Sequence, residues 1–499
     1  MTQDSPAPMD IERFHPLFKA RSVALIGASS NPRKWGYVML KNLINGGFTG
    51  SIYPINPDAD ELLGKKVYKT LEDVPETPDL AVIAVPPKSA LAAVQACTDK
   101  GIKAAVCITA GFAELGREGR RLQDEMVKAA RAGGMVMVGP NCNGIMSPWE
   151  KLYVDFPSFH VPPGSIALVC QSGGVVDGLA RRIMIKGMGC SLCVASGNEA
   201  DLHMEDYLAY LADDPRTSAI LCYIEGFKDA GRFYRIAREV TRKKPVVAYK
   251  AGKTEAGAKA AMSHTASIAG SDVIFDGVCR QAGIIRAKTL HHLFNVGTAF
   301  MNQPLPRGKR IGIVTAGGGW GVMAADECVS LGLEMAKLPE ETIKRLDAFL
   351  PAWWNRGNPV DLVAGSEPDD VLRVVDTVLA SPDVDGVIYL GLMPALRFTR
   401  EELAHRGSAG DAWGDALVRA SVEVAEHLSG LARKYDKPVV VASEHLISSA
   451  DQEARTLYAI GQSGNVCYEM PYEAAEVMAA LVSYGKWVEA DHFRTREAP

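Results

Sequence analysis

The stretch VALIGASSNPRKWG, residues 23–36, places a Gly directly after an apolar run and before a helical pattern. This order is the start of a strand–turn–helix unit. Further strand-like runs alternate with Ala- and Lys-rich helical segments, at residues 51–57, 80–87, 104–112 and 135–141. Apolar strands that alternate with helices indicate a parallel sheet covered on both faces. We therefore predict a Rossmann-like α/β domain over residues 1–150.

The rest of the chain contains an internal repeat. IALVCQSGG at 166–174 returns as IGIVTAGGG at 311–319, and GNEADL at 197–202 returns as GNPVDL at 357–362. Two more pairs follow in the same order, 211–224 with 379–392 and 243–250 with 436–443. Four matching blocks in one order indicate two copies of one α/β unit. We predict two flavodoxin-like, doubly wound domains over residues 151–303 and 304–499, with sites at the carboxyl ends of their strands.

The two copies differ where chemistry is expected. Alignment of Ile220 with Val387 places Glu225 opposite Leu392, so the first copy has a carboxylate where the second has an aliphatic side chain. A histidine in a small-residue loop also follows the first copy's strands and has no counterpart in the second. We predict that the first copy carries the chemistry and that the second is architectural.

Composition excludes several classes of protein. A chain of 499 residues with 47% hydrophobic and 23% charged residues is long enough for about three globular domains. The formal charge of −5 argues against a nucleic-acid partner. The sequence has no apolar run long enough for a membrane span and no basic-then-apolar signal segment. We expect a cytoplasmic protein that binds neither nucleic acid nor membrane.

The ten cysteines lie mostly in apolar, strand-like segments, which is typical of reduced, buried thiols. Cys190 and Cys193 form the single CxxC, and zinc would need a second ligand pair at suitable spacing. Residues three apart in a strand also face opposite sides of the sheet. We interpret this motif as structural and predict no metal site.

The first Gly-rich turn favours a phosphate-containing ligand. Backbone N–H groups after Gly27 and the positive end of the following helix suit a diphosphate, and Lys34 adds a charge. A dinucleotide site would normally have an acidic residue after the second strand, where this chain has Asn56. This disfavours a nicotinamide oxidoreductase. The alternative is a tight turn in which Gly serves only for steric reasons.

A second such turn, Gln171 to Gly174, lies between a strand and a predicted helix. Ser172 suits a helix N-cap, and the N–H groups of Gly173 and Gly174 would face an anion above them. The alternative is a nucleophilic serine, but that motif requires Gly where this chain has Cys170. We favour a phosphoryl-binding turn.

The segment AGKTEAGAKAAMSHTASIAGS, residues 251–271, contains thirteen Gly, Ala or Ser among its twenty-one residues. Small side chains lose little entropy when a loop moves between two environments. His264 lies near its middle, and imidazole is a nucleophile able to hold a phosphoryl group covalently. Glu225 ends the neighbouring strand and would orient the ring and stabilise its positive charge. A lone histidine is more often structural, and we apply that interpretation to the other nine.

Nine blocks together resemble the α part of NDP-forming acyl-CoA synthetases, which are relatives of succinyl-CoA synthetase. In chain order they are GASSNPRKWG, PINP, AVPP, ITAGFAE, GPNCNG, QSGG, SGNEADL, YIEGF and KAGKTEAGAKAAMSHTASIAGSD. The resemblance runs from about residue 11 through the final domain. The SHTASIAGSD block with its Gly/Ala tract is the most specific of them.

The resemblance implies that the first domain binds coenzyme A. Four residues would approach the CoA phosphates, namely Gly27, Ala28, Ser29 and Lys34. Five more would flank CoA or line the path of its thiol end, namely Val85, Pro86, Ile108, Thr109 and Asn141. His264 would be the phosphohistidine, Glu225 its supporting carboxylate, and Ser172, Gly173 and Gly174 the phosphate anchor.

The implied reaction converts acyl-CoA, phosphate and ADP to a carboxylic acid, CoA and ATP through an acyl phosphate and a phosphohistidine. Such enzymes hold ATP or ADP, with Mg²⁺, on an ATP-grasp module, and we expect none within residues 1–499. The resemblance therefore implies an ATP-grasp β subunit, an α2β2 assembly and inactivity of this chain alone. Two alternatives are a CoA-binding sensor or scaffold without turnover and, less favoured, an NAD(P)-binding oxidoreductase.

Overall fold

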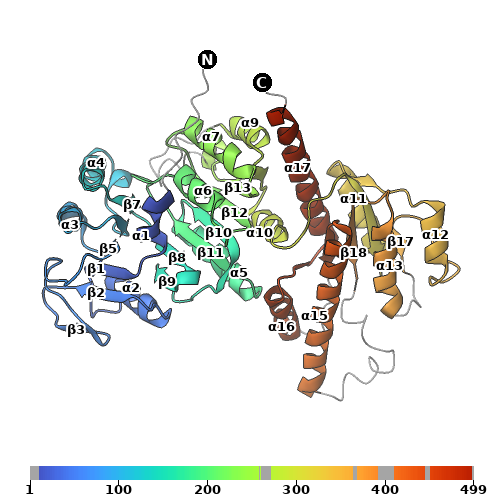
Figure 1. Ribbon diagram of the computed structural model, residues 1–499, viewed down its shortest axis with the longest axis horizontal. Coiled ribbons are helices and arrows are strands. Elements are labelled where there is room, and N and C mark those ends of the chain that lie inside the picture. Colours follow the sequence, from blue (N-terminus) through green and yellow to red (C-terminus); the bar gives the residue numbers. More distant parts are fainter. Residues whose placement is uncertain are drawn as a thin grey trace. The chain divides into compact units, whose positions relative to one another are not determined.

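The computed structural model describes residues 11–257, 259, 271–362, 368–391, 410–443 and 450–496. Its elements divide into two compact units (Figure 1). Unit 1 comprises Met1–Ile183 and Gly189–Arg286, and unit 2 comprises Met184–Met188 and Ala287–Pro499. In the described part of the chain, no helix combines the length and apolarity that a membrane span requires.

The first sheet of unit 1 is parallel and has the order β2-β1-β5-β6-β7. Its strands are β1 (Ser22–Ile26), β2 (Ser51–Ile55), β5 (Leu80–Ile83), β6 (Ala104–Cys107) and β7 (Val136–Val138). The helices that connect them are α2 (Trp35–Asn45), α3 (Pro87–Asp99) and α4 (Arg117–Ala132). The short helices η1 (Ile11–Phe14) and α1 (His15–Phe18) precede β1, and the hairpin β3 (Glu61–Leu62) and β4 (Lys65–Lys66) follows β2.

Alternation along these strands divides their side chains between two hydrophobic clusters. Val23 and Leu25 pack on the face covered by α2, whereas Ala24 packs on the opposite face, covered by α3 and α4 (Figure 1). Both faces are apolar because both are buried, as expected for a parallel α/β sheet. The continuous apolar runs of the sequence therefore follow from burial on two sides.

The second sheet of unit 1 has the order β14-β13-β12-β10-β11-β8-β9. Its parallel strands are β10 (Pro163–Cys170), β11 (Cys190–Ala195), β12 (Ala219–Ile224), β13 (Val246–Lys250) and β14 (Ile285–Arg286). Two antiparallel strands, β8 (Gly144–Ser147) and β9 (Leu152–Val154), extend this sheet. In the sequence they lie before and after residue 150, where the first domain was predicted to end. The helices are α5 (Gly173–Ile185), α6 (Met204–Ala212), α7 (Ala230–Thr241) and α9 (Asp272–Ala282).

One hydrophobic cluster continues from the first sheet into the second. It contains Val23 and Leu25 of β1 together with Val169 of β10 and Val194 of β11. A shared close-packed core fixes the two sheets of unit 1 against each other, because such interiors deform little. The loops at the carboxyl edges of both sheets therefore belong to one body.

Unit 2 is built on a third parallel sheet of order β16-β15-β18-β19-β20, with β17 paired to β15. Its strands are β15 (Arg310–Thr315), β16 (Glu334–Met335), β17 (Val360–Asp361), β18 (Gly386–Leu390), β19 (Val439–Ala442) and β20 (Cys467–Tyr468). The helices are α10 (Leu290–Ala299), α11 (Gly318–Ser330), α12 (Glu340–Asp347), α13 (Pro368–Ala380), α15 (Gly410–Tyr435), α16 (Ala450–Gln462) and α17 (Pro471–Arg496). The order matches β11-β10-β12-β13-β14 of unit 1, which confirms the fold predicted for the two copies.

The strand registers agree with the sequence alignment of the copies. Ala167 of β10 lies opposite Ile220 of β12, and Gly312 of β15 lies opposite Val387 of β18. Aligned residues thus occupy equivalent positions in the two sheets. A residue at the end of a strand in one copy can be compared directly with its partner in the other.

Candidate functional site

The first Gly-rich turn is formed by a close approach of backbones. Gly27 follows β1 with a φ of 94°, and a Cβ there would lie 2.5 Å from the carbonyl oxygen of Ala84. A Cβ on Gly36 of α2 would lie 2.0 Å from the carbonyl oxygen of Gly27. Neither position can hold a larger residue without displacing backbone. The turn therefore presents main-chain groups at the start of α2, as an anion site requires.

The other predicted residues of this turn lie beside Gly27. Ala28 and Ser29 are buried, and Asn56 donates a hydrogen bond from Nδ2 to the carbonyl oxygen of Ala28 at 2.7 Å. Ser29 Oγ accepts from the N–H of Asn31 at 3.1 Å. Lys34 is exposed immediately before α2. Asn56, where a dinucleotide site would have an acid, thus holds the turn itself.

The predicted residues at the carboxyl ends of β5, β6 and β7 are joined by hydrogen bonds. Thr109 Oγ1 donates to the carbonyl oxygen of Val85 at 2.7 Å, and the N–H of Asn141 donates to the carbonyl oxygen of Thr109 at 2.9 Å. Ile108 is buried, and Pro86 directly precedes α3. The structure thus brings Val85, Thr109 and Asn141 together at one edge of the first sheet.

The second Gly-rich turn lies at the carboxyl end of β10, where α5 begins at Gly173. A Cβ on Gly173 would lie 2.1 Å from the side chain of Asn143, whereas a Cβ on Gly174 would meet no atom of the described residues within 4 Å. Asn143 itself donates to Asp177 at 2.8 Å. Burial raises the pKa of Asp177 to about 6 although this hydrogen bond lowers it. Among the described residues, space for a side chain is thus present at Gly174, whereas the Asn143 amide fills it at Gly173.

Gln171 connects this turn to Glu225. Its Oε1 accepts from the backbone N–H groups of Glu225 at 2.5 Å and of Gly226 at 3.0 Å. Its Nε2 donates to the carbonyl oxygen of Gly226 at 2.8 Å. Glu225 is 5% exposed, and Tyr223 has a pKa raised by burial and by the charge of Glu225. One amide thus fixes the backbone that carries the predicted supporting carboxylate.

Gln171 Nε2 also donates to the buried carboxylate of Glu199 at 2.9 Å. Ser196 Oγ donates to the other oxygen of Glu199 at 2.7 Å. Burial raises the pKa of Glu199 to about 7, against the lowering effect of these two hydrogen bonds. Its φ of 48° costs a non-Gly residue about 1–3 kcal/mol. Glu199, Gln171 and Glu225 follow the adjacent strands β11, β10 and β12, so they form a row along the sheet edge.

His264 lies outside the described residues, and the structure describes where its loop starts. Ile224 of β12 is the parallel partner of Lys250 of β13, and the N–H of Ala251 donates to the carbonyl oxygen of Ile224 at 2.8 Å. Since Glu225 directly follows Ile224, the loop leaves the sheet beside the backbone of Glu225. The start of the loop and Glu225 are therefore neighbours.

Three residues of this site were not predicted from the sequence, and a fourth was predicted without the contacts that the structure gives it. Gly36 ends the VALIGASSNPRKWG stretch, and Asn143 lies in the GPNCNG block. Gln171 was predicted only as part of the second turn, and Glu199 lies in a repeat block in which the second copy has Pro359. The difference between the copies was thus an available signal for Glu199. Gln171 shows the same kind of difference, because it aligns with Ala316 in the second copy.

All ten cysteines are free and buried. Cys190 and Cys193 lie in β11, and burial raises the pKa of Cys193. Within the described ranges, no group of three or more His, Cys, Asp or Glu side chains is arranged to hold a metal ion. The CxxC motif is thus part of a buried strand.

Three families match the chain in succession. Residues 21–148 match the CoA binding domain, residues 163–300 the succinyl-CoA ligase like flavodoxin domain, and residues 311–399 the ligase-CoA domain. These assignments agree with the three large sheets, whose α/β strands are parallel, and with the predicted fold class.

Curated relatives match over most of the chain. The α subunit of acetate–CoA ligase [ADP-forming] II of Pyrococcus furiosus is 38% identical over 471 residues, which are 94% of this chain and 97% of the relative. The acetate–CoA ligase [ADP-forming] of Methanocaldococcus jannaschii is 41% identical over 70% of this chain and 49% of the relative. The chain thus covers nearly all of the first relative and about half of the second.

A solved structure agrees with these relatives. Dinucleotide-forming acetyl-coenzyme A synthetase 1 of Ca. Korarchaeum cryptofilum, in complex with phosphate and ADP, superposes with a TM-score of 0.84 at 32% identity. The match covers 97% of this chain and 99% of that one. From its three domains and its full-length relatives, this chain belongs to the ADP-forming acyl-CoA ligases of the succinyl-CoA synthetase superfamily, as an α subunit.

Proposed function

We propose that this subunit converts acyl-CoA and phosphate to an acyl phosphate and then takes the phosphoryl group onto His264. The observation that carries the proposal is the row of side chains at one sheet edge. Glu225 is held through Gln171 at the turn that ends in Gly173 and Gly174, beside the start of the His264 loop. Anion-binding amides, a buried carboxylate and a nucleophile on a small-residue loop are the parts that phosphoryl transfer through histidine requires.

CoA fits the carboxyl edge of the first sheet. Its diphosphate would lie on the backbone after Gly27, at the start of α2 near Lys34, since this close-packed Gly turn presents main-chain groups to an anion. Its thiol end would follow Val85 and Pro86 toward Ile108, Thr109 and Asn141. The hydrogen bonds that join Val85, Thr109 and Asn141 would hold this path in one shape.

The first step is attack of a phosphate oxygen on the thioester carbonyl carbon. The C–S bond breaks, CoA leaves as the thiol, and the acyl phosphate remains. The N–H groups at Ser172, Gly173 and Gly174 would hold the phosphate, because backbone donors at a helix start need no reorganisation to bind an anion.

In the second step a ring nitrogen of His264 attacks phosphorus. The bond from phosphorus to the acyl oxygen breaks, and the carboxylate leaves. Glu225 would accept a hydrogen bond from the other ring nitrogen and stabilise the positive charge that develops on the imidazole. Transfer to ADP then breaks the P–N bond and forms ATP, and the reverse direction produces the thioester.

The nucleotide and Mg²⁺ would bind to a separate ATP-grasp subunit, with which the chain would form an α2β2 assembly. The name of the Pyrococcus relative as a subunit alpha supports a partner subunit. The acyl group would come from a small carboxylic acid, as the acetate in the names of the relatives suggests.

The decisive experiment mixes the full-length chain with its nucleotide-binding subunit, Mg²⁺ and ATP labelled on the γ-phosphate. The label should appear on this chain as an acid-labile, base-stable phosphate that mass spectrometry locates at His264. His264→Ala should abolish labelling and ligase turnover while CoA binding and the thermal midpoint stay near wild type. A wild-type chain that binds CoA but acquires no label would instead be a CoA-binding module without turnover.

A further inference from the structure

The turn from Ser196 to Glu199, which follows β11, contacts the predicted CoA side of the site through Asn198. The N–H of Asn198 donates to the carbonyl oxygen of Pro140 at 2.9 Å, and Asn141 Nδ2 donates to Asn198 Oδ1 at 3.1 Å. A Cβ on Gly197 would lie 2.4 Å from the carbonyl oxygen of Asn141. The turn is thus in direct backbone contact with the loop that follows β7.

Asn198 also reaches the loop that follows β6. Its Nδ2 donates to Glu114 at 2.6 Å and to Gln123 at 3.0 Å. Glu114 in turn accepts from the backbone N–H groups of Gly111 at 2.5 Å and Phe112 at 3.1 Å. Burial opposes ionisation of Glu114, but the hydrogen bonds from Asn198 and from the backbone lower its pKa overall. One asparagine therefore fixes both loops beside Thr109 and Asn141.

The next residue, Glu199, faces the opposite direction, toward Gln171. Because its carboxylate accepts from Gln171 Nε2, the amide must turn its Oε1 toward the backbone N–H groups of Glu225 and Gly226. The reversed amide would place its NH₂ group against two N–H donors. Glu199, together with the backbone of Glu225 and Gly226, thus keeps the Gln171 amide in the orientation that holds the Glu225 turn.

We infer that Asn198 and Glu199 are positioning residues with separate tasks, Asn198 for the CoA end of the site and Glu199 for phosphoryl transfer. The inference rests on the proposed roles of His264 and Glu225. Neither residue acts on substrate. Both set distances between groups that do, and misplacement by about 1 Å can lower a rate about 10²-fold.

The test uses the full-length chain with its nucleotide-binding subunit. It measures the rate of His264 labelling from γ-labelled ATP by rapid quench and the Kd for CoA by calorimetry. Glu199→Leu removes the acceptor and should slow labelling about 10- to 100-fold, with Kd for CoA within about twofold of wild type. Glu199→Gln keeps an acceptor for Gln171 and should restore the rate to within about threefold of wild type.

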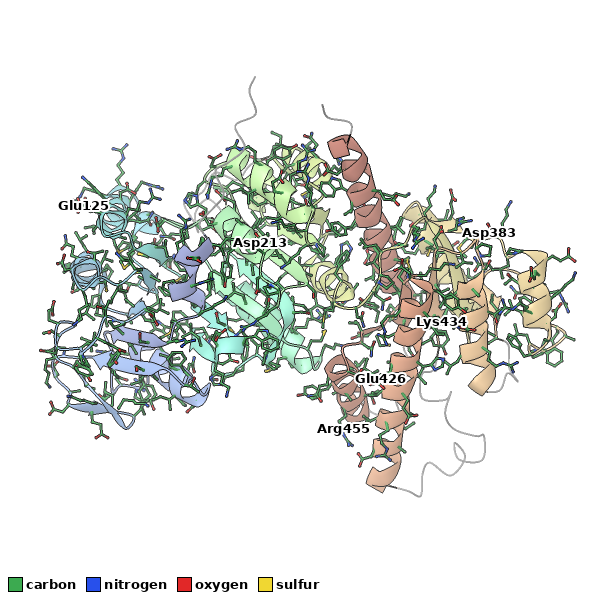
Figure 2. All side chains as sticks on the ribbon, viewed as in Figure 1. Glu125, Asp213, Asp383, Glu426, Lys434 and Arg455 are labelled. Carbon is green, nitrogen blue, oxygen red and sulfur yellow. The ribbon has the colours of Figure 1, made fainter. Side chains whose placement is uncertain are left out.

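Asn198→Ala should give the opposite pattern, a Kd for CoA raised about tenfold or more and a labelling rate within about threefold of wild type. Gln171→Met removes the same Gln171–Glu199 hydrogen bond as Glu199→Leu, and it replaces Glu199→Leu in the test if that variant does not fold. Asp213→Asn is the matched control, a half-exposed carboxylate on the same unit that pairs with Lys243 at 2.5 Å (Figure 2). It should change neither quantity.

The inference is overturned if the Asn198 and Glu199 variants change the labelling rate and the Kd for CoA alike. It is also overturned if Asn198→Ala leaves the Kd unchanged and Glu199→Leu leaves the labelling rate unchanged, or if Glu199→Gln labels as slowly as Glu199→Leu. Glu225→Gln separates this result from the proposed function. If that variant labels at the wild-type rate, the role of Glu225 is wrong and the inference falls with it. If it is slow while Glu199→Leu and Gln171→Met are normal, the inference alone is wrong.

Discussion

The two copies of the flavodoxin-like unit have one strand order and different residues at the strand ends. Gln171 aligns with Ala316, Glu199 with Pro359, and Glu225 with Leu392, which lies outside the described residues. The first copy thus has a connected set of polar side chains where the second has three apolar ones. The two copies keep the same strand order with and without this polar set, which is consistent with the proposed chemistry of the first copy.

The asparagine shared by the copies shows what the fold itself requires. Asn358 aligns with Asn198, and it accepts from the N–H of Ile313 at 2.9 Å and donates to the carbonyl oxygen of Ile311 at 2.8 Å. It therefore fastens its turn to its own sheet. Asn198 instead binds Asn141 and Glu114, which belong to the first domain's loops. The same residue type has a local task in one copy and an interdomain task in the other.

The largest expected difference between the copies lies at Glu225. Glu225→Gln keeps the volume and removes the charge that would stabilise the imidazole during phosphorylation. We expect His264 labelling to slow about 10²–10⁴-fold, in the range for a group that assists proton or charge transfer. Rapid-quench labelling with γ-labelled ATP measures it. A wild-type rate in this variant would exclude the supporting role.

The Gly-rich turns allow a matched pair of substitutions. Gly173→Ala places a Cβ 2.1 Å from the Asn143 side chain, whereas Gly318→Ala in the second copy meets, among the described residues, only the Asp361 carboxylate, at 2.9 Å. We expect Gly173→Ala to slow ligase turnover about 10- to 100-fold by displacing Asn143 over the phosphate turn. Gly318→Ala should stay within about twofold. Equal losses in both variants would contradict the assignment of phosphate binding to the first copy.

The smallest expected effect is a pH dependence of stability that comes from Glu199. The aligned residue of the second copy, Pro359, has no titratable side chain and cannot contribute one. Burial and the charge of Glu205 raise the pKa of Glu199 to about 7 from 4.5, while Ser196, Gln171 and His203 lower it. Between these values the folded state binds more protons than the unfolded state, so this residue's contribution to stability falls as pH rises. The thermal midpoint of Glu199→Gln should therefore improve relative to wild type between pH 5 and pH 8. A constant difference between the two proteins would show that the pKa is not raised.

The sequence predicted the fold because its strongest signals are local. Apolar runs that alternate with helical patterns require a parallel sheet buried on both faces, and four repeated blocks specify two similar units. The turns at Gly27 and Gly173 were also visible, because a Gly between a strand and a helix is typical of a tight, anion-binding turn. Glu225 was predicted from its place at a strand end and from the contrast with Leu392, and its role stays a prediction.

Only the tertiary structure determined which distant residues meet. Gln171, Glu199 and Glu225 are separated along the chain and become neighbours because β10 lies between β11 and β12 in the sheet. Asn198 reaches Asn141 and Glu114 because one hydrophobic core joins the two sheets of unit 1. Spacing along a chain specifies strands and turns, whereas strand order and packing select the side chains that share a site. The sequence thus predicted residues for the sheet edge, whose chemistry stays a prediction, whereas it did not predict the connection through Gln171.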